Sequence, residues 1–202
     1  YRQDSFLRGE PVGKKDFLLT KREAGIVFLL FLAGGCFALA WNNVLSMVHI
    51  SDYSASYHRI RETFYVGKFF MEFCVVCLLA PLAEELLYRG IVYQRGKDWL
   101  GIWPGIMISA VFFGLVHMNL VQFVYAGVFG IFLGLFVEKT GKLHSAVAAH
   151  AAANFTSLLR GETEVFSFMD KSFPVMVFMT VVLFLLAAGA IFLGIRIGDE
   201  QT

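Results

Sequence analysis

The chain has 202 residues, of which 57% are hydrophobic and 16% are charged, and its formal net charge is +1. In soluble domains of this size the hydrophobic share is nearer half, and the mean hydropathy here is +0.66. The balanced charge gives no reason to expect a nucleic-acid partner. Composition therefore predicts an all-α, polytopic integral membrane protein whose main surroundings are the lipid bilayer.

The first residues of the chain are polar, and they include six Lys and Arg residues. Thr20 and Glu23 are three residues apart, just before the first apolar run, in the pattern of a capping box at a helix start. We therefore expect a polar cytoplasmic N-terminal segment over residues 1–23 and a membrane-embedded domain over residues 24–197.

Apolar blocks of about 20 residues follow, and this length suits a bilayer core about 30 Å thick. They predict six membrane helices, with the charged residues gathered between them. The expected helices cover residues 24–48, 66–92, 101–117, 120–138, 143–159 and 174–196.

The distribution of basic residues predicts the orientation of these helices. With six helices both termini share one side of the membrane. That side carries the basic N-terminal segment and also Arg95, Lys97, Lys139, Lys142 and Arg196. Because loops rich in Lys and Arg stay in the cytoplasm, we expect both termini to be cytoplasmic.

Small residues predict where helices pack closely. Ala126, Gly130 and Gly134 recur at four-residue spacing, which allows neighbouring backbones to approach each other in lipid. The segment 143–159 is rich in alanine and only weakly hydrophobic. We expect it to lie inside the bundle with little lipid contact.

The second expected helix contains charged residues that are costly in a membrane. Glu85 and Arg89 are four residues apart, so they share a helix face and can pair. Glu84 is rotated by about 100° from Glu85, which leaves its carboxylate free. Pro81 lies just upstream, where it removes a backbone donor and can bend the helix toward a cavity. The alternative is an ordinary charged helix end at the membrane surface.

Two other expected helices carry polar side chains. His117 follows Phe113 by one helical turn, near the end of the third helix. Taken alone, such a histidine is more often interfacial or part of a core. His150 and Asn154 are four residues apart on one face of the alanine-rich helix. Taken alone, this pair fits a functional site and structural hydrogen bonds between helices equally well.

Together these residue types suit hydrolysis of a peptide bond. A glutamate or a histidine can act as general base on a water molecule, and a histidine with an asparagine can donate hydrogen bonds to an oxyanion. The residue types of Glu84, His117 and His150 would also suit zinc. The chain has no H-E-x-x-H sequence, the strongest zinc-protease signature, so we favour a site without metal or other cofactor.

Three motifs occur in order over residues 70–160. They are E-E-x-x-x-R at Glu84, Glu85 and Arg89, F-x-x-x-H at Phe113 and His117, and H-x-x-x-N at His150 and Asn154. This set resembles the CAAX protease and bacteriocin-processing family (CPBP, or Abi) of intramembrane proteases. Each motif alone is weak, whereas the three in order at membrane helix ends form a specific signal.

The resemblance implies a glutamic-type endopeptidase and a role for each matching residue. Glu84, helped by His117, would activate the attacking water. His150 and Asn154 would stabilise the oxyanion, while Glu85, Arg89 and Phe113 would support the site. Zinc held by Glu84, His117 and His150 is the alternative that the older description of this family implies.

Two other functions fit parts of the sequence. A membrane scaffold or bacteriocin-immunity protein would use the same residues to bind a peptide without cutting it. A transporter would use them as a proton path, but no two related halves with paired broken helices are visible. Expected substrates of the protease are a lipidated CAAX protein, a bacteriocin leader or a signalling-peptide precursor. The style of the sequence points to a prokaryotic cell membrane and to peptide maturation or immunity.

Overall fold

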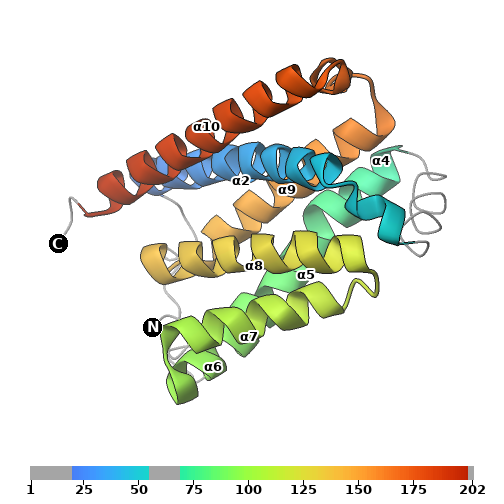
Figure 1. Cartoon of the computed structure of the whole chain (residues 1–202). Helices are drawn as coiled ribbons and strands as arrows, with labels where there is room; N and C mark the ends of the chain where they lie inside the picture. Colours follow the sequence, from blue (N-terminus) through green and yellow to red (C-terminus); the bar gives the residue numbers. More distant parts are fainter. Residues whose placement is uncertain (1–19, 55–68, 200–202) are drawn as a thin grey trace.

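The computed structural model describes residues 20–54 and 69–199 (Figure 1). Within these ranges the chain is helical and contains no β-strand, which confirms the predicted all-α class. Five long helices match predicted ones closely. They are α2 (Lys21–Met47), α7 (Ile102–Leu115), α8 (Leu120–Thr140), α9 (Leu143–Glu162) and α10 (Phe173–Asp199).

The remaining predicted helix is one continuous helical stretch in which two π-helical segments interrupt the α-helix. In order it contains α4 (Phe69–Glu72), η3 (Phe73–Leu79), α5 (Ala80–Leu87), η4 (Tyr88–Val92) and α6 (Tyr93–Leu100). The predicted end at residue 92 was wrong. Tyr93 is fully buried and the helix continues until Gly101, whose φ of 93° favours glycine and stops it.

The start of α2 forms as the sequence predicts. The side chain of Thr20 accepts a hydrogen bond from the backbone N–H of Glu23, and the Glu23 carboxylate accepts one from the backbone N–H of Thr20. This completes a capping box, which satisfies two of the backbone donors that a helix start leaves free. Residues 1–19 of the predicted cytoplasmic segment lie outside the described residues.

Helix α9 occupies the interior of the bundle. It contacts α2, α8, η3 and α5, while α10 packs along α2 and α7 packs along α8 (Figure 1). Its buried alanines join a core that includes Leu30 of α2 and Phe129 and Leu133 of α8. The structure therefore confirms that the alanine-rich helix is internal, and this places His150 and Asn154 beside the charged second helix.

Two glycines explain how closely these helices approach each other. A Cβ atom at Gly34 would lie 2.2 Å from the carbonyl oxygen of Ala149, so α2 and α9 meet backbone to backbone. A Cβ at Gly130 would lie 3.1 Å from the Cα atom of Ala110, where α8 meets α7. The predicted close packing along Ala126, Gly130 and Gly134 is confirmed, since all three residues are buried.

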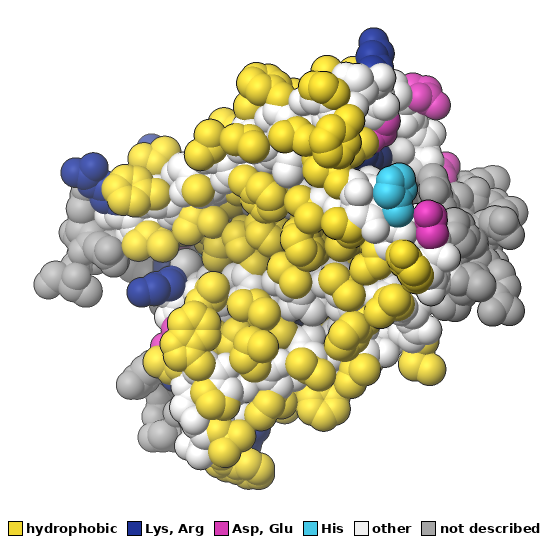
Figure 2. All heavy atoms as spheres, viewed as in Figure 1, with side chains coloured by type: hydrophobic (Ala, Val, Ile, Leu, Met, Phe, Trp, Pro, Cys, Tyr) yellow, Lys and Arg dark blue, Asp and Glu magenta, His cyan; other side chains and the backbone are white. Residues whose placement is uncertain are grey.

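The outer surface is largely apolar. Leu86, Phe112, Leu185 and Phe192 are each about half exposed or more, and Figure 2 shows hydrophobic side chains covering much of one face. Soluble monomers rarely expose continuous apolar surface of this extent. In the described part of the chain, three helices are long and apolar enough to cross a bilayer, namely α2, α8 and residues 173–197 of α10, and α7 is a shorter apolar helix. The protein is an integral membrane protein.

Candidate active site

Helix α5 carries the two adjacent glutamates of the candidate site. Glu85 is fully buried, whereas the side chain of Glu84 is 30% exposed. The predicted i,i+4 pair is present, with 2.8 Å between Nη1 of Arg89 and Oε1 of Glu85. Both partners have no exposed side-chain surface, so this is a buried ion pair at the centre of the bundle.

His150 of α9 meets both glutamates through its two ring nitrogens. Its Nδ1 lies 2.8 Å from Oε1 of Glu85, and its Nε2 lies 3.5 Å from Oε2 of Glu84. The sequence predicted that Glu84 would turn away from the face of Glu85. The two carboxylates do occupy different positions around α5, yet one buried imidazole lies close to both.

The Glu85–Arg89 pair sets the proton positions on His150. Oε1 of Glu85 accepts from Nη1 of Arg89 and lies equally close to Nδ1 of His150. An oxygen that already accepts from Arg89 is suited to accept a second hydrogen bond, from a hydrogen on Nδ1 of His150. In the neutral ring the lone pair then belongs to Nε2, the nitrogen that faces Glu84.

The ring of Phe113 holds several members of the site in place. Its centroid lies 5.4 Å from the His117 ring and 5.4 Å from the His150 ring, with both pairs edge to face. The guanidinium carbon of Arg89 lies 4.5 Å from the same centroid. A cation over an aromatic face is attracted to it, so Phe113 also supports the buried arginine.

His117 lies at the end of α7 and does not pair directly with a carboxylate in the described part of the chain. Its Nδ1 lies 2.9 Å from the carbonyl oxygen of Phe113. A carbonyl accepts, so Nδ1 carries the hydrogen and Nε2 again has the lone pair. The structure thus brings Glu84 to His150, while His117 joins this group through the ring of Phe113.

Asn154 contacts the first π-helical segment. Its side-chain N–H donates to the carbonyl oxygen of Val76 at 2.8 Å. In the π-helical pattern each N–H binds the carbonyl five residues earlier, as Ala80 does with Val75. The next residue is Pro81, which has no N–H, so Asn154 takes the carbonyl that this proline leaves unpaired. The second hydrogen of its amide nitrogen remains for another acceptor.

Two further residues position the site although the sequence did not single them out for it. The hydroxyl of buried Ser109, on α7, donates to the carbonyl of Tyr88 at 2.8 Å, in the second π-helical segment. The carbonyl of Gly130 accepts from Nη2 of Arg89 at 3.0 Å. Ser109 is a polar residue in an apolar helix, one turn before Phe113. This position in the sequence could have indicated that it supports the site.

By residue type, Glu84, His117 and His150 are the possible zinc ligands of this site. Within the described residues, no group of three or more His, Cys, Asp or Glu side chains is arranged so that it could hold a metal ion. The absence of a cofactor stays a prediction.

The part of the chain that contains this site is similar to known proteins. Residues 66–156 match the model of a family described as "Rce1-like: Type II CAAX prenyl endopeptidase Rce1-like". That segment contains all seven residues of the three sequence motifs. This part of the chain is therefore similar to CAAX prenyl endopeptidases.

A curated relative of this segment is the human protein named CAAX prenyl protease 2. It is 26% identical over 98 residues, which cover 39% of this chain and 30% of the relative. The chain therefore matches under one third of the length of that relative. No solved structure matches the chain.

Proposed function

We propose that this protein is an intramembrane endopeptidase that hydrolyses a peptide bond with a water molecule activated by Glu84. The observation that carries the proposal is the position of His150 between two different carboxylates. Buried Glu85, paired with Arg89, fixes one ring nitrogen, and partly exposed Glu84 faces the other. A fixed imidazole beside an accessible carboxylate is a common arrangement for acid–base catalysis.

In the proposed reaction Glu84 takes a proton from a bound water molecule. The water oxygen then forms a bond to the carbonyl carbon of the peptide, and the C=O electron pair moves onto the carbonyl oxygen. When this oxyanion collapses, the C–N bond breaks and the departing nitrogen receives the proton from Glu84. The separation of 3.5 Å between Glu84 and His150 suits two groups that share a water or substrate atom.

The oxyanion would be stabilised by His150 and Asn154. For this role His150 would take up a second proton from solvent before the attack and keep it throughout the reaction. It would then donate from both nitrogens, to Glu85 through Nδ1 and to the oxyanion through Nε2. The free amide hydrogen of Asn154 is the second donor. A single oxyanion donor of this kind contributes about 2.7–4 kcal/mol to catalysis. His117 would support Glu84 through a water molecule, since its Nε2 has the lone pair.

The family description and the name of the human relative concern CAAX prenyl endopeptidases. We therefore propose a membrane-associated protein with a prenylated C-terminal CAAX sequence as the substrate class. A prenyl chain holds such a substrate at the membrane, where a site between membrane helices can reach it. A bacteriocin leader, the other substrate predicted from the sequence, serves as the comparison.

The first test is cleavage of a farnesylated CAAX peptide by the purified protein in lipid nanodiscs. We expect release of the three residues that follow the prenylated cysteine, and no cleavage of the same peptide without the farnesyl group. Because the proposed mechanism uses no metal, 1,10-phenanthroline and EDTA should leave the rate unchanged.

Three results would contradict these expectations. Loss of activity with chelators and its return with added zinc would show a metal enzyme. Preferential cleavage of a bacteriocin leader would replace the substrate class. Saturable peptide binding without any product would support the scaffold alternative.

A further inference from the structure

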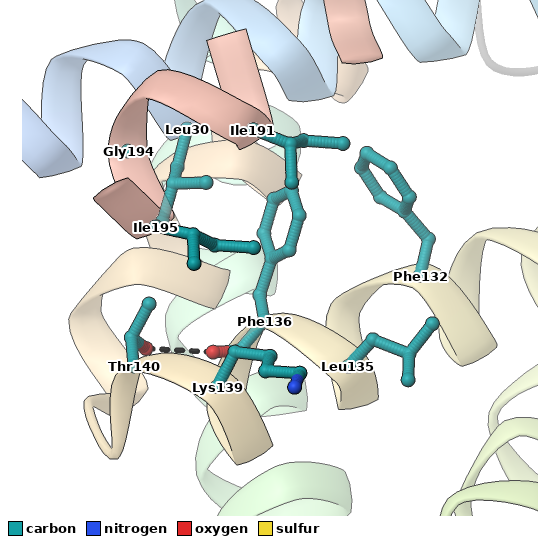
Figure 3. Close-up of a pocket in the computed structure, with 9 residues that line it drawn as sticks. All are labelled: Leu30, Phe132, Leu135, Phe136, Lys139, Thr140, Ile191, Gly194 and Ile195. Atoms are coloured by element: carbon teal, nitrogen blue, oxygen red, sulfur yellow. Dashed lines mark hydrogen bonds between the residues drawn. The ribbon is translucent and has the colours of Figure 1, made fainter. Parts of the chain in front are cut away.

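A groove lies between α8, α10 and α2, on helices that carry none of the proposed catalytic residues. It has a volume of about 200 Å³. Figure 3 shows the rings of Phe132 and Phe136 of α8 reaching toward Ile191 of α10. Leu135 and Ile195 also line the groove. Leu30 of α2 completes the apolar lining.

The lining determines what kind of ligand the groove can accept. Along its length it offers aliphatic and aromatic side chains, and the hydroxyl of Thr140 already donates to the carbonyl of Phe136 at 2.6 Å (Figure 3). All three lining helices are long and apolar enough to cross a bilayer. An apolar groove on such helices suits a hydrocarbon chain from the surrounding lipid.

The groove has a basic end. Lys139, in the last turn of α8, belongs to the lining and is exposed. Arg196 directly follows Ile195 in the last turn of α10 and is also exposed. The nearby basic residues Lys97 and Lys142 are paired with Glu138 and Glu23, respectively. Lys139 forms no ion pair with any residue in the described ranges.

We propose that this groove binds an anionic phospholipid, with one acyl chain in the apolar part and the phosphate beside Lys139. Basic pockets between membrane helices on the cytoplasmic side bind anionic lipid head groups. The positive-inside rule predicts that this end of the helices is cytoplasmic. Charge favours an anionic lipid over a zwitterionic one, while the apolar lining accepts an acyl chain from either.

The proposal can be tested by native mass spectrometry of the full chain in detergent, titrated with dioleoyl phosphatidylglycerol or dioleoyl phosphatidylcholine. The unmodified protein should bind phosphatidylglycerol more tightly. Removing one basic residue near the membrane surface should weaken that binding about fivefold, so we expect this loss for Lys139→Gln and no change with phosphatidylcholine. Lys171→Gln removes an exposed lysine ahead of α10, at the other end of the bundle, and should bind both lipids unchanged.

A second variant tests the apolar part of the site. A Cβ at Gly194 would make only ordinary contacts of 3.9 Å with Leu29 and Leu30, so Gly194→Leu can fill the groove without a backbone clash. It should weaken binding of both lipids, while its melting temperature in detergent stays near that of the unmodified protein. If this variant fails to fold, the two lysine variants decide the question.

Equal binding of the two lipids by the unmodified protein would overturn the proposal, and so would equal effects of Lys139→Gln and Lys171→Gln. Displacement of bound lipid by a farnesylated peptide, together with no effect of Lys139→Gln, would assign the groove to a prenyl chain instead. None of these results depends on peptide cleavage, so the lipid site and the proposed protease can fail independently.

Discussion

At the scale of single residues, the Glu85–Arg89 pair is the part of the site on which the others depend. Glu85 holds His150, and Arg89 contacts Phe113 and the carbonyl of Gly130. Both charges are completely buried. Removing one partner leaves the other uncompensated, which is far more costly than replacing both with apolar residues.

We therefore expect Arg89→Met to lower the free energy of unfolding by about 3–5 kcal/mol. The double variant Glu85→Leu/Arg89→Met should recover much of this loss while remaining inactive, because His150 loses its partner. Lys142→Met, which breaks the partly exposed pair with Glu23, should cost about 1 kcal/mol or less. Denaturant unfolding in mixed micelles measures all three; equal losses for Arg89→Met and Lys142→Met would contradict the buried role of Arg89.

The Glu85–Arg89 ion pair could be predicted from the sequence, because residues four apart lie on the same face of one helix. The position of His150 could not be derived in that way. It depends on how α9 packs among the other helices, through contacts such as that of Ala149 with Gly34 of α2, which is distant in sequence. His117 lies beside Phe113 because the two are one helical turn apart, whereas its lack of a direct contact with Glu84 is a tertiary result.

At the scale of helices, α8 is shaped to receive the side chain of Arg89. A Cβ at Gly130 would lie 2.9 Å from Nη2 of Arg89 and 3.1 Å from the Cα atom of Ala110. Gly127, one turn earlier, has only the carbonyl of Ala110 near its Cβ position, at 4.0 Å. The two glycines therefore form a matched pair for substitution.

Gly130→Ala should lower stability by about 1–3 kcal/mol, as overpacking does, and should also reduce catalysis because Arg89 shifts. Gly127→Ala should be neutral or stabilising by up to about 1 kcal/mol, since alanine is the better helix former. Melting temperature and peptide cleavage, measured together, check both. A Gly130→Ala variant as stable and active as Gly127→Ala would show that the arginine has more room than the structure gives it.

The helices themselves were largely predictable from apolar blocks and from the capping box at Thr20. The two π-helical segments were not, because they lie inside continuous apolar sequence and add no distinct pattern to it. Their carbonyls at Val76 and Tyr88 are bound by Asn154 and Ser109 from neighbouring helices. The sequence predicts that Pro81 disturbs its helix. The residue that binds the unpaired carbonyl, Asn154, lies 73 positions later in the chain.

At the scale of the whole molecule, the end of α8 and the start of α10 lie at opposite ends of the bundle (Figure 1). Lys139 is in the last turn of α8, and Lys171 comes just before α10. The predicted orientation puts Lys139 in the cytoplasm and Lys171 outside. A membrane-impermeant maleimide should therefore label Lys171→Cys in intact cells and label Lys139→Cys only after lysis. Native Cys36, Cys74 and Cys77 are free and are replaced with alanine first. Labelling in the reverse order would invert the orientation and the side on which the lipid head group lies.

The central claim concerns the water that Glu84 activates. Cleavage of the farnesylated peptide in H₂¹⁸O, followed by mass spectrometry, measures this water directly. The unmodified protein and a Glu164→Gln control, altered at an exposed glutamate, should give a new carboxylate containing one ¹⁸O atom. Glu84→Gln should fold normally and lower the rate of ¹⁸O-labelled product formation by about 10²–10⁴. Product formation by Glu84→Gln at the unmodified rate would contradict the account.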